Sequence, residues 1–301
     1  MQPTSKIVAV VIPLSNRQDL TPDEKISFRH LVYFLGKYDK FLVVPRSLKV
    51  DYPGFAIKRF PNKFFGSSMA HTQLMMSLKF YKAFKEYKYI LLYHLDALVF
   101  SDQLMEWCER DLDYIGAPFL KCPDSPWVKV PRVGNGGFSL RKIESFLRVI
   151  NSPRYSVNPA KYWEDFCASK PKYIQYLNLP KKYLKRLHIF NSARWVMSKW
   201  HLVEHSHDDL FWSDEAVKYY PEFKVASVEL GLRFAFEVVP RVCFEQNSYT
   251  LPFGCHAWPR YDRDFWEPYL LSPIGRVKTP AYTERPVFDH SGESIEERRD
   301  L

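Results

Sequence analysis

The sequence predicts an α/β protein with a mostly parallel central sheet flanked by helices. In the first half of the chain, short apolar segments rich in β-branched or aromatic residues alternate with longer amphipathic segments. Strands that alternate with helices in this way form parallel sheets that are covered on both faces. With 301 residues, of which 46% are hydrophobic, the chain can also build one large core.

Local signals place the elements of the first half. Strands are expected at residues 6–14, 40–45, 55–60, 89–100 and 114–119, and helices at 20–38, 67–87 and 101–111. The first helix begins with Thr21 as its N-cap and Pro22 at its first position, and Glu24 completes a capping box. Ser101 and Asp102 are expected to cap the third helix.

The second half differs in composition. A helix is expected at 143–150, and residues 155–205 predict a basic, mainly helical insertion in a single domain of residues 1–267. Residues 223–238 return to apolar structure. Residues 268–301 are Pro-rich and then charged, which predicts a C-terminal tail.

The net charge of +9 favours an anionic partner, such as a nucleoside diphosphate, a polyanion or an anionic membrane. Much of this charge lies between Lys161 and Lys199, where a solvated helix face is an equally good interpretation. Because no zinc-finger spacing or RNP-like motif accompanies it, no nucleic-acid partner is expected. Five unpatterned cysteines and an N-terminus without a long apolar segment predict a cytoplasmic protein, with peripheral membrane association as a further expectation.

The apolar segment 89–100 carries His94 and Asp96 in its middle. An unpaired buried charge is costly, so Asp96 must reach solvent, pair with a basic group or hold a cation. Ligands of open α/β sheets bind beyond the carboxyl ends of strands. A carboxylate beside an imidazole suits a divalent cation there. Capping of the following helix is the structural alternative.

The segment Gly134–Asn135–Gly136–Gly137 holds three of the chain's 11 glycines. These glycines are expected to permit positive φ angles and to let the backbone approach a ligand closely. Their spacing matches neither a dinucleotide-binding fingerprint nor a phosphate-binding P-loop. A tight turn between strands is the alternative.

Two later segments carry further titratable residues. Asp208 and Asp209 follow His207, and one carboxylate of such a pair can accept the proton of an acceptor hydroxyl while its neighbour hydrogen-bonds a sugar. Helix capping is the commoner use of adjacent aspartates. His256 lies between a Gly-Cys turn and an aromatic residue, where it is either a ligand or a structural histidine.

In this order, the four segments resemble the GT-A class of nucleotide-sugar glycosyltransferases. In that class a DxD motif at a strand end holds a metal, a Gly-rich segment lies beside the donor sugar, an xED motif supplies the base and a late histidine completes the metal site. The resemblance implies that Asp96, His256 and His94 hold a divalent cation, Mn²⁺ or Mg²⁺. It implies Asp209 as the base, with Asp208 beside it, and it places the basic insertion of residues 155–205 on the acceptor side. The implied donor-binding residues are Pro13, Leu14, Ser15, His94, Asp96, Asn135, Gly136 and Gly137.

Between about Val8 and Trp266, the chain also resembles a bacterial and fungal family of domains of unknown function that are regarded as glycosyltransferases. The segments that carry this resemblance are "YILLYHLDALVF", "DYIGAPF", "VGNGGFSLRK", "DDLFWS" and "LPFGCHAW". The chain departs from the class pattern twice. His94 replaces the first acid of DxD, and Asp208 stands where glutamate is more usual.

The resemblance implies a metal-dependent, inverting transferase. It would move a sugar from a UDP-sugar to a hydroxyl of a glycan or lipid-linked glycan in the synthesis of surface polysaccharide of the O-antigen or capsule type. A retaining transferase on the same fold is one alternative. A non-catalytic nucleotide or polyanion binder is the other, and the replacement at His94 allows it.

Overall fold

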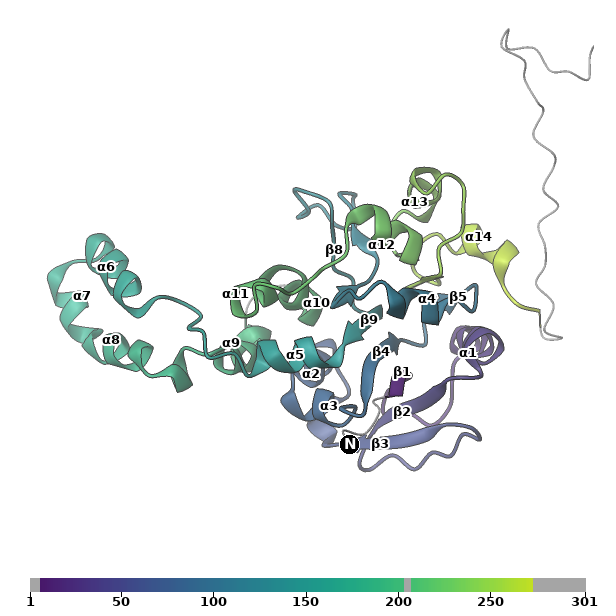
Figure 1. Ribbon diagram of the computed structural model, residues 1–301, viewed down its shortest axis with the longest axis horizontal. Helices are drawn as coiled ribbons and strands as arrows, with labels where there is room; N and C mark the ends of the chain where they lie inside the picture. The colour runs from purple at the N-terminus through teal and green to yellow at the C-terminus, as the bar shows by residue number, and fades with distance from the viewer. Residues whose placement is uncertain (1–5, 203–206, 273–301) are drawn as a thin grey trace, which may run out of the picture.

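A six-stranded sheet forms the centre of the computed structural model, which describes residues 6–202 and 207–272 (Figure 1). Its strand order is β3-β2-β1-β4-β9-β6. The strands are β1 (Lys6–Pro13), β2 (Asp39–Pro45), β3 (Ala56–Phe60), β4 (Tyr87–Tyr93), β6 (Tyr114–Ile115) and β9 (Phe138–Lys142). The first four are mutually parallel, and β9 runs antiparallel to both β4 and β6. The predicted α/β class with a mostly parallel sheet is confirmed.

Helices cover both faces of this sheet, as the side chains of β1 show. Val8, Val10 and Ile12 pack in the same core as Leu31 of helix α1 (Pro22–Leu35). Ala9 and Val11 point the other way, toward the helices α2 (Ser68–Met75), α3 (Leu78–Lys82) and α5 (Ile143–Ile150). Successive side chains of a strand point to opposite faces, so a strand buried on both faces is apolar throughout.

The capping box of α1 forms as predicted. Thr21 Oγ1 accepts a hydrogen bond from Glu24 N–H at 3.2 Å, and the Glu24 carboxylate accepts one from Thr21 N–H at 2.7 Å. The predicted helix at 67–87 is wrong, because it is two helices, α2 and α3. Ser77 separates them, since its hydroxyl accepts from Phe80 N–H and starts a new helix.

The expectation of an unbroken strand at 89–100 is also wrong. β4 ends at Tyr93 and β5 (Leu98–Val99) belongs to another sheet, with a turn between them in which Ala97 N–H donates to His94 O. Nor do Ser101 and Asp102 cap the helix α4 (Leu104–Glu109), which is preceded by Gln103. Asp102 forms an ion pair with Lys37 at 2.6 Å instead.

Two small sheets lie beside the central one. β10 (Ala235–Phe236), β11 (Gly254–Cys255) and β5 form a three-stranded sheet, and β7 (Pro118–Phe119) pairs with β8 (Arg132–Val133). The strand expected at 114–119 is therefore divided between β6 and β7, with Gly116 and Ala117 between them. Gly116 cannot carry a side chain, because a Cβ there would lie 2.0 Å from Asn135 O.

The remaining elements are mostly helical. The helices are α6 (Pro159–Ser169), α7 (Lys172–Leu177), α8 (Leu179–Arg186), α9 (Ala193–Lys199), α10 (Asp208–Leu210), α11 (Ala216–Tyr219), α12 (Val228–Phe234), α13 (Pro240–Gln246) and α14 (Arg263–Trp266). A π-helical turn covers Phe211–Glu215, and 3₁₀ turns cover Asn62–Phe64, His188–Phe190, Trp200–Leu202 and Glu267–Tyr269. No helix in the described ranges is both long and apolar enough to cross a bilayer. Most of the predicted tail, residues 273–301, lies outside the described residues.

Candidate active site

A cleft of about 680 Å³ lies at the edge of the central sheet where the parallel strands end. It contains every residue of the predicted site. These are Pro13, Leu14, Ser15, His94, Asp96, Asn135, Gly136, Gly137, Asp208, Asp209 and His256. Residues separated by up to 243 positions in the chain therefore meet in one cavity.

The pairing of strands in the two sheets brings together the residues that were predicted to hold a metal ion. His94 follows β4 directly, and its N–H donates to Gly137 O at 2.9 Å just before β9 begins. In the smaller sheet Cys255 is paired with Leu98, so His256 and the turn that holds Asp96 lie at the same end. Trp258 N–H donates to Asp96 O at 3.1 Å and ties the two segments to each other.

His94, Asp96 and His256 form a cluster that fits a metal ion. Each offers one ligand atom, and these atoms all lie within 4.8 Å of one another. Nε2 of His256 lies 3.3 Å from Asp96 Oδ1, which is an ion-pair contact, yet this buried nitrogen forms no hydrogen bond in the described part of the chain. A buried nitrogen without a hydrogen bond is costly, whereas a bound cation would satisfy it.

The donor set of two imidazoles and one carboxylate favours a transition metal such as Mn²⁺ over Mg²⁺, which prefers oxygen ligands alone. Burial lowers the pKa of His94 well below its ordinary value, so this imidazole is neutral and able to act as a ligand. Burial raises the pKa of Asp96, but the neighbouring His256 more than offsets this and holds that pKa well below the usual range. Asp96 is therefore a carboxylate at neutral pH.

Glu237 orients the His256 ring. It follows β10, which pairs in parallel with β11, so Glu237 and His256 leave adjacent strand ends. Nδ1 of His256 lies 3.1 Å from Glu237 Oε1, and a proton on Nδ1 leaves Nε2 directed at Asp96. Although burial opposes a charged imidazole, the two carboxylates raise the pKa of His256 well above its ordinary value. Positive charge is therefore favoured at Nε2, as either a proton or a metal ion.

The acidic pair divides into two environments. Asp208 is buried, and its Oδ2 lies 3.1 Å from Nη2 of Arg141, a guanidinium with no exposed surface. Asp209 Oδ1 accepts a hydrogen bond from Leu210 N–H at 2.8 Å. Burial, together with the negative charges of Asp208 and Glu237, raises the pKa of Asp209 to about 8. Neither carboxylate caps α10, because the residue before that helix is His207.

The glycines serve close packing, which corrects the expectation of positive φ angles. Among the described glycines only Gly54 and Gly66 have positive φ. A Cβ on Gly137 would lie 2.0 Å from Nε2 of His256, so this position must be glycine for the histidine to face the cleft. Asn135 closes the loop, since its Oδ1 accepts from Gly137 N–H at 3.1 Å.

Leu14 lies differently from the other predicted donor-binding residues. Its side chain is buried in the core beneath the cleft, and its N–H donates to Val43 O at 2.9 Å. Pro13 is half-buried and Ser15 is exposed, so these two border the open part of the cleft.

The sequence profile of the DUF5672 family, which is described as a protein of unknown function, matches residues 54–256, two thirds of the chain. The chain belongs to the DUF5672 family. No curated protein matches this DUF5672 sequence. Two crystal structures of the glycosyltransferase GlyE from Streptococcus pneumoniae TIGR4, one of them the apo form, are similar at 12% sequence identity with a TM-score of 0.40. The similarity covers 87% of the DUF5672 chain but only 59% of the GlyE chain.

Three residues of this DUF5672 site were missed by the sequence reasoning. Glu237 is an acid at the end of an apolar segment, the same signal that singled out Asp96. Arg141 lies in β9, a strand that was not predicted, so its charge did not stand out against an apolar segment. His71 gave no signal, because it lies on an amphipathic helix, yet its Nε2 is 3.2 Å from Nε2 of His94.

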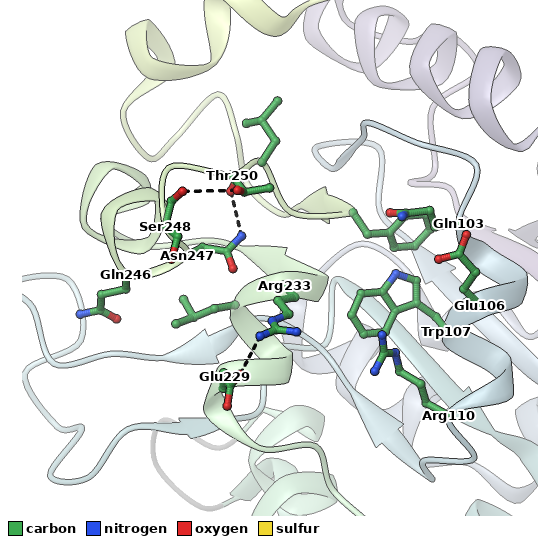
Figure 2. Close-up of a pocket in the computed structure, with 13 residues that line it drawn as sticks. Gln103, Glu106, Trp107, Arg110, Glu229, Arg233, Gln246, Asn247, Ser248 and Thr250 are labelled. Carbon is green, nitrogen blue, oxygen red and sulfur yellow. Dashed lines mark hydrogen bonds and ion pairs between the residues drawn. The ribbon is translucent and has the colours of Figure 1, made fainter. Parts of the chain in front are cut away.

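A second cavity, of about 460 Å³, lies between α4, α12 and the loop before β11 (Figure 2). The Arg110 guanidinium lies over the Trp107 ring at 4.7 Å, and Arg233 pairs with Glu229 at 2.7 Å. This cavity shares no lining residue with the first, and the His-Asp-His cluster lies outside it. The first cavity is therefore the candidate active site of the DUF5672 protein.

Proposed function

We propose that this DUF5672 protein is a metal-dependent glycosyltransferase that uses a nucleoside-diphosphate sugar. The observation that carries the proposal is that a His-Asp-His cluster and a half-buried carboxyl group of raised pKa, Asp209, share one cleft at the carboxyl edge of a parallel sheet. Transfer of a glycosyl group from a diphosphate requires charge stabilisation on one side of the reacting carbon and a base on the other. The cleft supplies residues suited to both tasks.

His94, Asp96 and His256 are the proposed metal ligands, with Mn²⁺ preferred to Mg²⁺. When bound, the cation neutralises the charge that grows on the leaving diphosphate. Arg260 also lines the cleft and adds positive charge for the same group, whereas Arg17 is paired there with Glu24. Pro13, which is half-buried, and Ser15, which is exposed, are proposed to border the nucleoside. Asn135, Gly136 and Gly137 are proposed to lie beside the sugar.

Asp209 is the proposed catalytic base. Its raised pKa makes its carboxylate a stronger base than an ordinary aspartate, which suits abstraction of a hydroxyl proton near neutral pH. Asp208 is a positioning residue in this proposal, because its carboxylate already forms an ion pair with Arg141. When the hydroxyl oxygen bonds to the anomeric carbon, the bond to the diphosphate oxygen breaks and the proton passes to Asp209. Attack from the face opposite the leaving group inverts the configuration.

The proposed donor is a UDP-sugar, and the proposed acceptor is a hydroxyl of a glycan or lipid-linked glycan of a surface polysaccharide. A thermal-shift panel of UDP-, GDP- and CDP-sugars, each with and without Mn²⁺, tests the donor. We expect one nucleotide series to stabilise the protein only with Mn²⁺, and Asp96→Asn to remove that stabilisation. The wild type should also hydrolyse the stabilising donor slowly. NMR of the anomeric proton of the transfer product should show inversion.

The proposal fails if no nucleotide sugar stabilises the protein with Mn²⁺, or if the Asp96→Asn variant responds as the wild type does. Stabilisation without any donor turnover would instead support the non-catalytic nucleotide binder. Retention at the anomeric carbon would exclude the role given to Asp209.

A further inference from the structure

Residues 159–190 form an arm that extends away from the central sheet (Figure 1). The arm consists of α6, α7, α8 and the 3₁₀ turn His188–Phe190, and these helices contact one another. None of the four elements has a fully buried residue. The arm therefore exposes surface that a helix of a globular core would cover.

The exposed surface of the arm is unusually apolar. Between residues 173 and 190 the exposed large hydrophobic side chains are Tyr173, Tyr176, Leu177, Tyr183, Leu184, Leu187, Ile189 and Phe190. Leu177 is 73% exposed and Ile189 is 69% exposed. Tyr173, Tyr176 and Leu177 have the i, i+3, i+4 spacing that places side chains on one face of a helix. Such contiguous apolar exposure marks an interaction surface.

The same arm is strongly basic. Residues 159–190 contain seven lysines and arginines but only two acidic residues, Glu164 and Asp165. Two of the lysines hold the arm together, since Lys182 lies over the Trp163 ring at 5.2 Å and Lys185 lies over the Tyr162 ring at 5.6 Å. Five other basic residues of the arm are exposed, namely Lys161, Lys170, Lys172, Lys181 and Arg186.

We propose that the arm docks on the surface of an anionic lipid bilayer. Helices that lie at a membrane surface combine tyrosines and aliphatic side chains, which enter the interface, with basic side chains that meet anionic headgroups. An RNA or polyanionic glycan would account for the basic residues but would leave Leu177, Leu187 and Ile189 in water. A second copy of the arm would repel this one, because both carry the same excess of positive charge.

The proposal is independent of sugar transfer, because it rests only on the arm. Its test is co-sedimentation of the full chain with vesicles of phosphatidylcholine, with and without 30 mol% phosphatidylglycerol, in the absence of any sugar donor. We expect binding to the anionic vesicles only. The charge variant Lys170→Gln/Lys172→Gln/Lys181→Gln/Arg186→Gln should bind about tenfold or more weakly. The apolar variant Leu177→Gln/Leu187→Gln/Ile189→Gln should also bind more weakly.

A matched control removes four exposed lysines elsewhere: Lys49, Lys85, Lys121 and Lys129, each replaced by Gln. It lowers the net charge equally and should keep most of the vesicle binding. Circular dichroism of each variant checks that α6–α8 remain folded.

Four outcomes overturn the proposal. The wild type fails to bind anionic vesicles, or the charge and apolar variants bind as the control does. Alternatively, the wild type binds no vesicles but forms a dimer, and the apolar variant is a monomer. This result assigns the arm to a contact with a second copy. Salt-sensitive RNA binding without vesicle binding likewise assigns it to a nucleic acid.

Discussion

Glu237 and His256 form a carboxylate–imidazole pair at 3.1 Å, while Asp96 lies 3.3 Å from the other nitrogen of the same ring. The ring is therefore held between two carboxylates, and Glu237 decides which nitrogen faces the cleft. Partners of this kind fix the orientation of a metal-binding histidine and increase its basicity.

The first prediction concerns Glu237. Replacement by Ala should weaken Mn²⁺ binding by about 10- to 100-fold, because the His256 ring loses its orientation. Glu237→Gln retains a hydrogen-bond acceptor for the Nδ1–H of His256, so its Mn²⁺ affinity should fall less than that of Glu237→Ala. Isothermal titration with Mn²⁺ in the absence of nucleotide measures both. Glu222→Gln, an exposed glutamate away from the cleft, is the control and should bind Mn²⁺ as the wild type does. Wild-type affinity in Glu237→Ala would contradict the role of the pair.

Gly137 is predicted to be intolerant of a methyl group for a specific reason. A Cβ there meets Nε2 of His256, so Gly137→Ala should displace that nitrogen and abolish Mn²⁺ binding. Gly134→Ala is the matched control, because its Cβ would meet the Phe119 ring at the same 2.0 Å. Both should lower stability, by about 1–3 kcal/mol. Only Gly137→Ala should lose the metal, as measured by electron paramagnetic resonance of free Mn²⁺.

The Asp209 carboxylate is predicted to be needed for activity and to lower the stability of the fold. Asp209→Asn should abolish transfer and leave Mn²⁺ binding largely intact. It should also raise Tm at pH 8, by roughly 2–6 °C, since it removes a carboxylate that burial and two neighbouring negative charges disfavour. Unchanged turnover in the variant would remove Asp209 as the base.

The sign of the pH dependence of this stability follows from the raised pKa. The unfolded chain ionises Asp209 at about pH 4, whereas the folded chain ionises it at about pH 8. The unfolded state therefore gains from deprotonation across this interval, and the contribution of Asp209 to stability falls as pH rises from about 4 to 8. The gain in Tm of Asp209→Asn should accordingly be absent below about pH 4 and largest above pH 8. Differential scanning calorimetry at several pH values measures it.

The pH profile of transfer should report the same group. A base must be deprotonated, so kcat should rise as pH increases through about 8 and level off above it. Glu237→Gln removes one of the charges that raise this pKa and should move the midpoint to lower pH. A profile that falls across this range would exclude Asp209 as the base.

Arg141 is predicted to be a major determinant of stability. Arg141→Met leaves Asp208 buried without its cation, which should cost about 3–5 kcal/mol in urea unfolding. The double variant Arg141→Met/Asp208→Asn should recover part of this loss. Arg132→Met provides the comparison, because it breaks an exposed ion pair with Asp214 and should cost about 1 kcal/mol or less. Equal losses from the two arginines would contradict the prediction.

The sequence by itself determined the parts of the protein that depend on neighbouring residues. Apolar segments rich in β-branched residues identified β1, β2 and β3, and the capping box at Thr21 located the start of α1, because strand burial and helix caps are encoded within a few positions. Eight of the residues that line the cleft were also predicted from their charge or their clustered glycines, which stand out in an apolar context: His94, Asp96, Asn135, Gly136, Gly137, Asp208, Asp209 and His256.

Only the tertiary structure decided how these residues are paired. Sequence periodicity cannot show that β4 ends at Tyr93 and that β5 joins another sheet, because pairing with β11 sets that break. The partners of His256 and Asp208, Glu237 and Arg141, are 19 and 67 positions away in the chain. Their contacts arise from strand register and burial, and those same contacts determine which carboxylate is neutralised and which keeps a raised pKa.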